Sequence, residues 1–160
     1  MSRLESPTPF ELRKLRIIAD VQFGKGTGKI LFPDAILVER SRATKRIRYV
    51  FLNNKRICSF RVQDGYLTLS LAGGELLAKN GLGKKVVIDN ESEPFVRDGK
   101  SVFAQHVIYA DENIGVRDEV IILNNHKELV AIGTAKLSSR LMLELNKGVA
   151  VSVRKGMKKK

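Results

Sequence analysis

The chain has 160 residues, enough for one domain or two small ones, and 43% of them are hydrophobic, so it can bury real cores. Its formal net charge of +12 indicates either a polyanionic partner or simple solubility. A single cysteine, Cys58, excludes an internal disulfide framework and a cysteine-based zinc site within one chain. No apolar run is long enough to span a bilayer, and the first residues lack the apolar segment of a secretory signal. We therefore expect a cytoplasmic protein without a membrane partner.

The first predicted element is a helix. Thr8 can accept from first-turn amides, Pro9 suits the first helical position and Glu11 completes a capping box. Gly24 is expected to end this helix. Residues 22–35 follow as a glycine-rich loop whose spacing does not fit a nucleotide-binding phosphate loop, so a tight turn is the simpler interpretation.

An antiparallel meander is predicted next. Asn53 and Asn54 provide a tight turn because Asn tolerates positive φ. A short helix over residues 73–80 follows the meander. We expect an α+β domain with an antiparallel sheet over residues 1–82. Its strands are predicted at residues 35–40, 46–52, 56–62 and 66–71.

The second half predicts a small closed or nearly closed β-barrel over residues 83–155, followed by a basic tail at 156–160. A glycine-led turn or short helix is expected at residues 99–104. A helix is expected from Ser138 or Ser139 to Asn146, and Gly148 leads the last strand. The other strands are predicted at residues 85–89, 107–110, 119–123 and 129–137.

The charges are segregated along the chain. The stretch from Arg40 to Arg61 holds eight basic residues and no acid, whereas acids cluster at residues 89–93 and 111–119. Such segregation favours nucleic-acid binding over mere solubility. We expect a secondary basic patch in this stretch, made of Arg40, Arg42, Lys45, Arg46, Arg48, Lys55 and Arg56.

Residues able to support catalysis or metal binding do not form a recognisable pattern. His106 and His126 lack a second histidine or a cysteine at ligand spacing, so we expect no metal, and His106 is interpreted as a packed or surface ring. Ser138, Ser139 and Ser152 have no histidine and aspartate partners in a hydrolase signature. The sequence therefore predicts no cofactor and no enzymatic activity.

Four stretches of the sequence, over nearly its whole length, carry a resemblance to a known family. They are ADVQFGKGTGKILFPD from Ala19, VERSRATKRIRYVFLNNKRICSFRVQDGYLTLSLAGGELL from Val38, VVIDNESEPFVRDGKSVFAQHVIYAD from Val86 and GVAVSVR from Gly148. Together they resemble the C-terminal region of archaeal archaeosine tRNA-guanine transglycosylases, where a small α+β domain precedes a PUA pseudo-barrel. The resemblance implies a non-catalytic tRNA-binding protein linked to tRNA modification. The family's catalytic barrel, with its aspartate nucleophile and zinc site, has no counterpart in this sequence.

The partner implied by the resemblance is RNA, most of all tRNA, which the chain would bind either beside a separate transglycosylase catalytic subunit or alone. The alternative is a translation or ribosome-biogenesis factor that contains a PUA domain and binds the ribosome. By the family pattern, RNA would lie against the glycine-led segment and the final strand, where glycine permits close approach to the backbone. The implied contact residues are Arg97, Gly99, Lys100, Ser101, Val102, Phe103, Ala104, Gly148, Val149, Ala150, Val151, Arg154 and Lys155.

Overall fold

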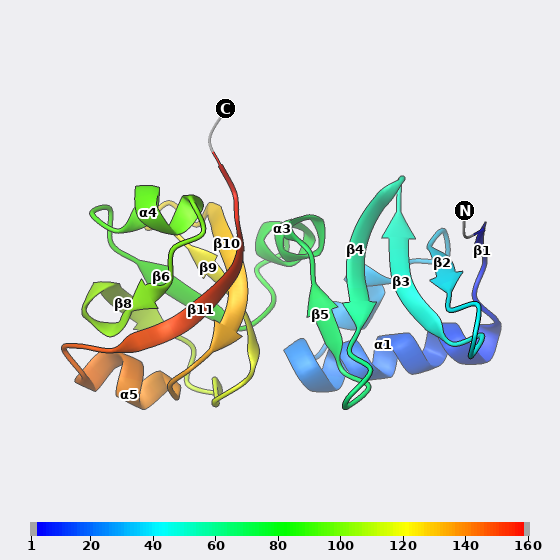
Figure 1. Cartoon of the computed structure of the whole chain (residues 1–160), viewed down its shortest axis with the longest axis horizontal. Coiled ribbons are helices and arrows are strands. Elements are labelled where there is room, and N and C mark those ends of the chain that lie inside the picture. The colour runs from blue at the N-terminus through cyan, green and yellow to red at the C-terminus, as the bar shows by residue number, and fades with distance from the viewer. Residues whose placement is uncertain (1–2, 159–160) are drawn as a thin grey trace. The chain divides into compact units, whose positions relative to one another are not determined.

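A computed structural model describes residues 3–158 of the chain. The chain divides into two compact units, with the division between Leu82 and Gly83. We call them unit 1 and unit 2 in chain order, and Figure 1 shows the elements of each. In the part of the chain that is described, no helix combines the length and apolar character that crossing a bilayer requires.

Unit 1 begins with the predicted capped helix, α1 (Pro9–Phe23). The Thr8 side chain accepts from the Glu11 amide, the Glu11 carboxylate accepts from the Thr8 amide, and Gly24 caps the other end. The prediction of a loop after α1 was wrong in part, because α2 (Thr27–Leu31) forms there. The buried Thr27 hydroxyl donates to the Ala19 carbonyl at 2.8 Å, so a tertiary contact with α1 holds this short helix.

Unit 1 also contains an antiparallel sheet in the order β1-β2-β3-β4-β5. Val38, Val50, Cys58 and Leu69 pair in register and form one buried row across four strands. Burial raises the pKa of the Cys58 thiol. The two-residue strand β1 was not predicted. The elements are β1 (Leu4–Glu5), β2 (Leu37–Arg40), β3 (Ile47–Leu52), β4 (Lys55–Phe60), β5 (Leu67–Leu69) and α3 (Leu71–Lys79).

Unit 2 is built on a six-stranded sheet in the order β7-β11-β10-β9-β6-β8. Strands β6 and β9 are parallel, and the other neighbours are antiparallel. The strands are β6 (Lys85–Ile88), β7 (Val102–Phe103), β8 (Val107–Ala110), β9 (Glu119–Leu123), β10 (Leu129–Ala135) and β11 (Val149–Gly156), and the helices are α4 (Glu93–Arg97), the 3-10 turn η1 (Ala104–His106) and α5 (Ser139–Glu144).

The sheet of unit 2 is nearly closed. Its two edge strands, β7 and β8, follow one another in the chain and are joined only by η1. Val86, Ile122, Val130 and Val151 are fully buried in a common core of apolar side chains. The predicted fold class, an α+β domain followed by a pseudo-barrel, is confirmed.

The ends of unit 2 differ from the prediction in detail. Helix α4 was not predicted, and α5 ends at Glu144 instead of Asn146. Strand β11 continues to Gly156, and the Met157 amide donates to the Val130 carbonyl at 2.8 Å. The first residues of the expected tail therefore belong to the folded unit, whereas residues 159–160 lie outside the described part of the chain.

Candidate nucleic-acid interface

The two segments predicted to contact RNA lie side by side in unit 2. Strand β7 pairs antiparallel with β11, with Phe103 opposite Val149 and Val102 opposite Val151. The Ala104 amide donates to the Gly148 carbonyl at 2.9 Å. Residues 99–104 and 148–155 therefore form one continuous edge, which we call the β7–β11 edge.

Glycines mark both corners of this edge. Gly99 and Gly148 have φ values of +98° and +93°, which side chains rarely adopt. Hydrogen bonds from Gly99 to Val96 and from Lys100 to Phe95 turn the chain from α4 towards β7. A Cβ added at either glycine would meet no atom within 4 Å. The backbone at both corners is thus open to a ligand such as a phosphate.

The side chains along the β7–β11 edge fall into two groups. Lys100, Phe103 and Lys155 are exposed, and Ser101 and Val149 are half-buried. Four other predicted residues are buried in the barrel core, so they supply backbone and shape to the edge instead of side-chain contacts. They are Val102, Ala104, Ala150 and Val151.

The two predicted arginines also form ion pairs within unit 2. Arg97 is only 8% exposed; its Nε donates to Glu93 Oε2 at 2.9 Å and its Nη1 to the Met157 carbonyl at 2.9 Å. Arg154 binds the buried Glu119 carboxylate with two hydrogen bonds, of 2.7 and 2.9 Å. Each guanidinium group therefore compensates the charge of a carboxylate that is buried or nearly buried.

One residue of the secondary basic patch in unit 1 is likewise held internally. The Arg40 guanidinium donates to Glu11 at 2.6 Å through two nitrogens and to Glu5 at 2.5 Å. Hydrogen bonding to Arg40 lowers the pKa of Glu11 to about 2, and the same bond raises the pKa of Arg40. The other members are exposed, namely Arg42, Lys45, Arg46, Arg48, Lys55 and Arg56.

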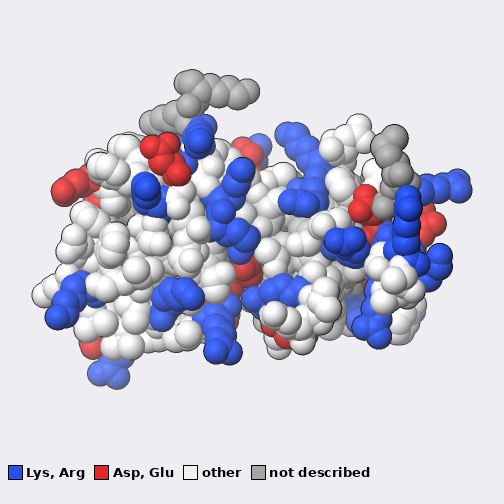
Figure 2. Space-filling view, in the orientation of Figure 1, with Lys and Arg blue, Asp and Glu red and all other residues white. Residues whose placement is uncertain are grey.

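Two of these exposed arginines contact an aromatic ring. The guanidinium carbons of Arg48 and Arg56 lie 5.1 and 5.0 Å from the centroid of the Tyr49 ring, and Arg48 also donates to the Tyr49 hydroxyl at 3.2 Å. The ring holds two planar cations at the surface, an arrangement suited to phosphates and to the faces of unpaired bases. On the face drawn in Figure 2, Lys and Arg are far more frequent than Asp and Glu.

Two family models together match most of the chain. Residues 13–81 match the patch-forming domain C2 of tRNA-guanine transglycosylase, and residues 84–157 match the PUA domain. The chain joins a transglycosylase C2 domain to a PUA domain. The matched part of the relatives is their C-terminal region, which confirms the family resemblance. Unit 1 corresponds to the C2 domain and unit 2 to the PUA domain.

The relatives are much longer proteins. The chain is 45% identical over 148 residues to a tRNA-guanine(15) transglycosylase of Methanothermobacter thermautotrophicus, covering 91% of this chain and 23% of the relative. A transglycosylase of the same name from Thermococcus onnurineus is 42% identical over 159 residues, covering 98% and 27%. The chain thus spans about a quarter of the curated relatives it matches. A hypothetical protein of Pyrococcus horikoshii has the same fold, with a TM-score of 0.77, 21% identity and coverage of 99% and 96%.

Two lysines beside the β7–β11 edge were not identified from the sequence. Lys147 directly precedes Gly148, and the Lys136 amide donates to the Ala150 carbonyl at 2.8 Å; both side chains are exposed. The position of Lys147 directly before Gly148 could have identified it from the sequence. Lys136 carried no such signal, because its closeness to β11 depends on strand pairing.

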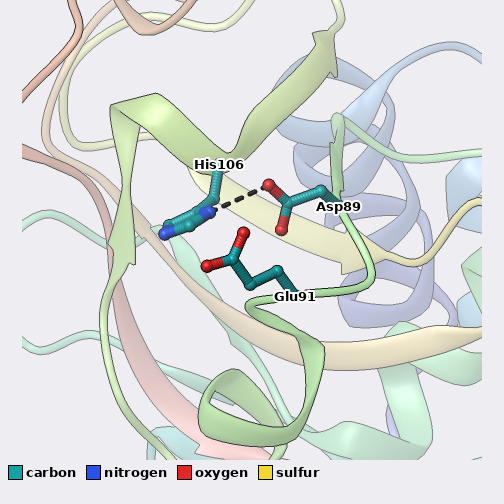
Figure 3. Close-up of side chains that lie close together, drawn as sticks. All are labelled: Asp89, Glu91 and His106. Carbon is teal, nitrogen blue, oxygen red and sulfur yellow. Dashed lines mark hydrogen bonds and ion pairs between the residues drawn. The ribbon is translucent and has the colours of Figure 1, made fainter.

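A second missed feature of the PUA domain is a group of three titratable side chains, Asp89, Glu91 and His106. His106 Nδ1 lies 2.8 Å from Asp89 Oδ2, and the Glu91 carboxylate points towards the same place (Figure 3). Partial burial raises the pKa of Asp89, but hydrogen bonds from His106 and Ser92 outweigh it and lower that pKa overall. Sequence reasoning considered His106 alone, because 17 positions separate it from Asp89.

Proposed function

We propose that the chain is an RNA-binding module that binds tRNA and serves tRNA modification. In this proposal it performs no chemistry itself, and it acts beside a transglycosylase catalytic subunit. The C2 and PUA family matches and the names of the relatives support the link to tRNA modification. The net charge of +12 supports a polyanionic partner.

The observation that carries the proposal is the β7–β11 edge of the PUA domain. The open corners at Gly99 and Gly148 let a phosphate or ribose approach the backbone. The exposed side chains of Lys100 and Lys155 supply positive charge on the same edge. Phe103, 46% exposed, offers an aromatic surface on the same edge. Backbone approach, charge and stacking together favour RNA over an acidic protein surface.

The secondary basic patch of the C2 domain is proposed as a second, weaker contact. Its exposed arginines and lysines suit the phosphate backbone, which supplies affinity without sequence information. The guanidinium pair on Tyr49 is its best-defined part, because the ring restrains both cations before RNA arrives.

Fluorescence anisotropy with labelled tRNA tests the proposal. Lys100→Gln with Lys155→Gln removes two charges from the β7–β11 edge, and Lys79→Gln with Lys127→Gln removes two exposed charges elsewhere. The two variants have the same net charge, so any difference between them is local. The edge variant should lose about tenfold or more in affinity, and the slope of log K against log salt should fall by about 2.

Equal losses in the two variants would show that tRNA binds through general charge and not through this edge. A salt slope near zero would contradict the electrostatic basis altogether. Co-purification then identifies the partner: the proposal expects association with tRNA and a transglycosylase catalytic subunit. Co-migration with ribosomal subunits instead would favour a translation or ribosome-biogenesis role.

A further inference from the structure

The cluster of Asp89, Glu91 and His106 in the PUA domain combines one imidazole with two carboxylates. Each residue offers one ligand atom, and the three atoms lie within 4.8 Å of one another. Figure 3 shows that the side chains converge from two chain segments, one after β6 and the other in η1. This donor set differs from a merely acidic surface cluster, because imidazole is the commonest protein ligand for transition metals.

Rigid elements hold two of the three donors in place. The Asp89 amide donates to the His106 carbonyl at 3.0 Å, and the β6–β8 pairing continues directly beyond it. Asp89 Oδ1 accepts from the Ser92 amide at 2.9 Å, which fixes the carboxylate and leaves Oδ2 directed at the imidazole. Asp89 and His106 are half-buried, so the pair is partly shielded from water.

Glu91 is the residue of this cluster whose position is not explained by the ion pair between Asp89 and His106. The hydrogen bond between Asp89 and His106 accounts for those two residues. Within residues 3–158, no hydrogen bond or ion pair engages Glu91, yet its carboxylate points at the same imidazole (Figure 3). Two carboxylates directed at one ring repel each other, and a divalent cation between them would remove that repulsion.

We propose that Asp89, Glu91 and His106 form a binding site for a first-row divalent metal ion of the zinc type. Ligand atoms around a tetrahedral ion, at bonds of about 2.1 Å, lie about 3.4 Å apart. Rotation of the exposed Glu91 side chain closes the remaining gap. His106 binds through Nδ1 with its proton moved to Nε2, and the Gln105 amide, whose nitrogen lies 3.3 Å from Nε2, turns so that its oxygen accepts that proton's hydrogen bond; water completes the coordination.

The donor set also determines which ions are expected. An imidazole nitrogen favours zinc and its neighbours, whereas magnesium prefers oxygen ligands only and retains most of its waters. Two carboxylates neutralise a divalent ion, and binding by a neutral imidazole needs a change of tautomer together with a turn of the Gln105 amide. We therefore expect Zn²⁺ and Co²⁺ to bind, and Mg²⁺ not to compete at equal concentration.

Titration calorimetry with ZnCl₂ on the tag-free, EDTA-treated 160-residue chain tests the site. The titration contains no RNA, so its result is independent of the proposed RNA binding. The chain contains two histidines, so His106→Asn has a matched control in His126→Asn. Glu91→Gln is paired in the same way with Glu112→Gln, since both glutamates are exposed. One equivalent should bind, and both cluster variants should lose more than about tenfold in affinity while the controls keep it.

Co²⁺ titration provides the direct readout of ligation. Its visible absorption should change on binding to the unmodified protein, and paramagnetic NMR shifts should affect the His106 ring and not that of His126. If His106→Asn unfolds, Glu91→Gln decides the question, because Glu91 is exposed. Absence of saturable Zn²⁺ binding, or equal losses in the cluster and control variants, would overturn the proposal.

Discussion

Replacing Arg154 tests whether its guanidinium stabilises the barrel or contacts RNA. In the structure it forms two hydrogen bonds with Glu119, whose side chain is 1% exposed. Removing one partner of a buried pair costs about 3–5 kcal/mol, because the other charge stays buried and uncompensated. Arg154 itself is 34% exposed, so we expect the lower end, about 3 kcal/mol, for Arg154→Met.

Thermal and urea unfolding followed by circular dichroism measure this loss. In a domain of this size, 3 kcal/mol corresponds to a decrease of about 12–24 °C in the Tm of the PUA transition. The double variant Glu119→Gln with Arg154→Met should recover more than half of the loss, since no charge then remains buried. A stable Arg154→Met variant with weakened tRNA binding would refute this reasoning and restore Arg154 as an RNA contact.

Two further predictions concern the C2 domain. The lowered pKa of Glu11, about 2 when folded against 4.5 ordinarily, means that its pairing with Arg40 stabilises the fold above pH 4.5 and is lost as the pH falls towards 2. Allowing for solvent screening, Glu11→Gln should cost about 1 kcal/mol at pH 6 and about a quarter of that at pH 2.5, in urea unfolding across that range; a pH-independent difference would contradict the pairing. Gly28→Ala would place a Cβ 2.3 Å from the Arg16 carbonyl oxygen and should destabilise by about 1–3 kcal/mol or more in the same assay. The exposed Gly65→Ala change should not act through packing, because nothing lies within 4 Å of its added Cβ.

Local signals in the sequence were enough to predict most elements correctly. The capping box at Thr8 and Glu11 specifies the start of α1 through contacts within one turn. The Asn53-Asn54 turn, with φ values of +52° and +64°, connects β3 and β4 as expected. Such features are visible without any knowledge of the rest of the fold.

Two of the missed elements, α2 and β1, depend on contacts between distant residues. Helix α2 follows two glycines and is held by Thr27 bonding back to α1. Strand β1 has two residues and exists only because it pairs with β2. No local pattern of propensity or periodicity reveals such elements, because their stability comes from tertiary contacts.

The same distinction explains the arginines of the candidate interface. In the sequence Arg40 lies in a long acid-free stretch, yet folding brings Glu5 and Glu11 to it from a distant segment. Arg154 finds Glu119 in the same way, across β10. A count of charges along a chain therefore overestimates the charge available to RNA, since ion pairs form between distant residues.

In the proposed interface, the exposed lysines are better candidates for RNA contacts than the ion-paired arginines. Arginine has a planar fork that matches a carboxylate with two hydrogen bonds, so it is the cation favoured in buried pairs. Lysine is a strongly hydrated point charge that stays in water, and when it neutralises a phosphate the nucleic acid releases a counterion. We therefore propose that Lys100, which follows the open Gly99 corner, and Lys155, which is exposed on β11, are better placed to bind RNA than Arg97 and Arg154. The tRNA affinity of this PUA edge should accordingly depend strongly on salt.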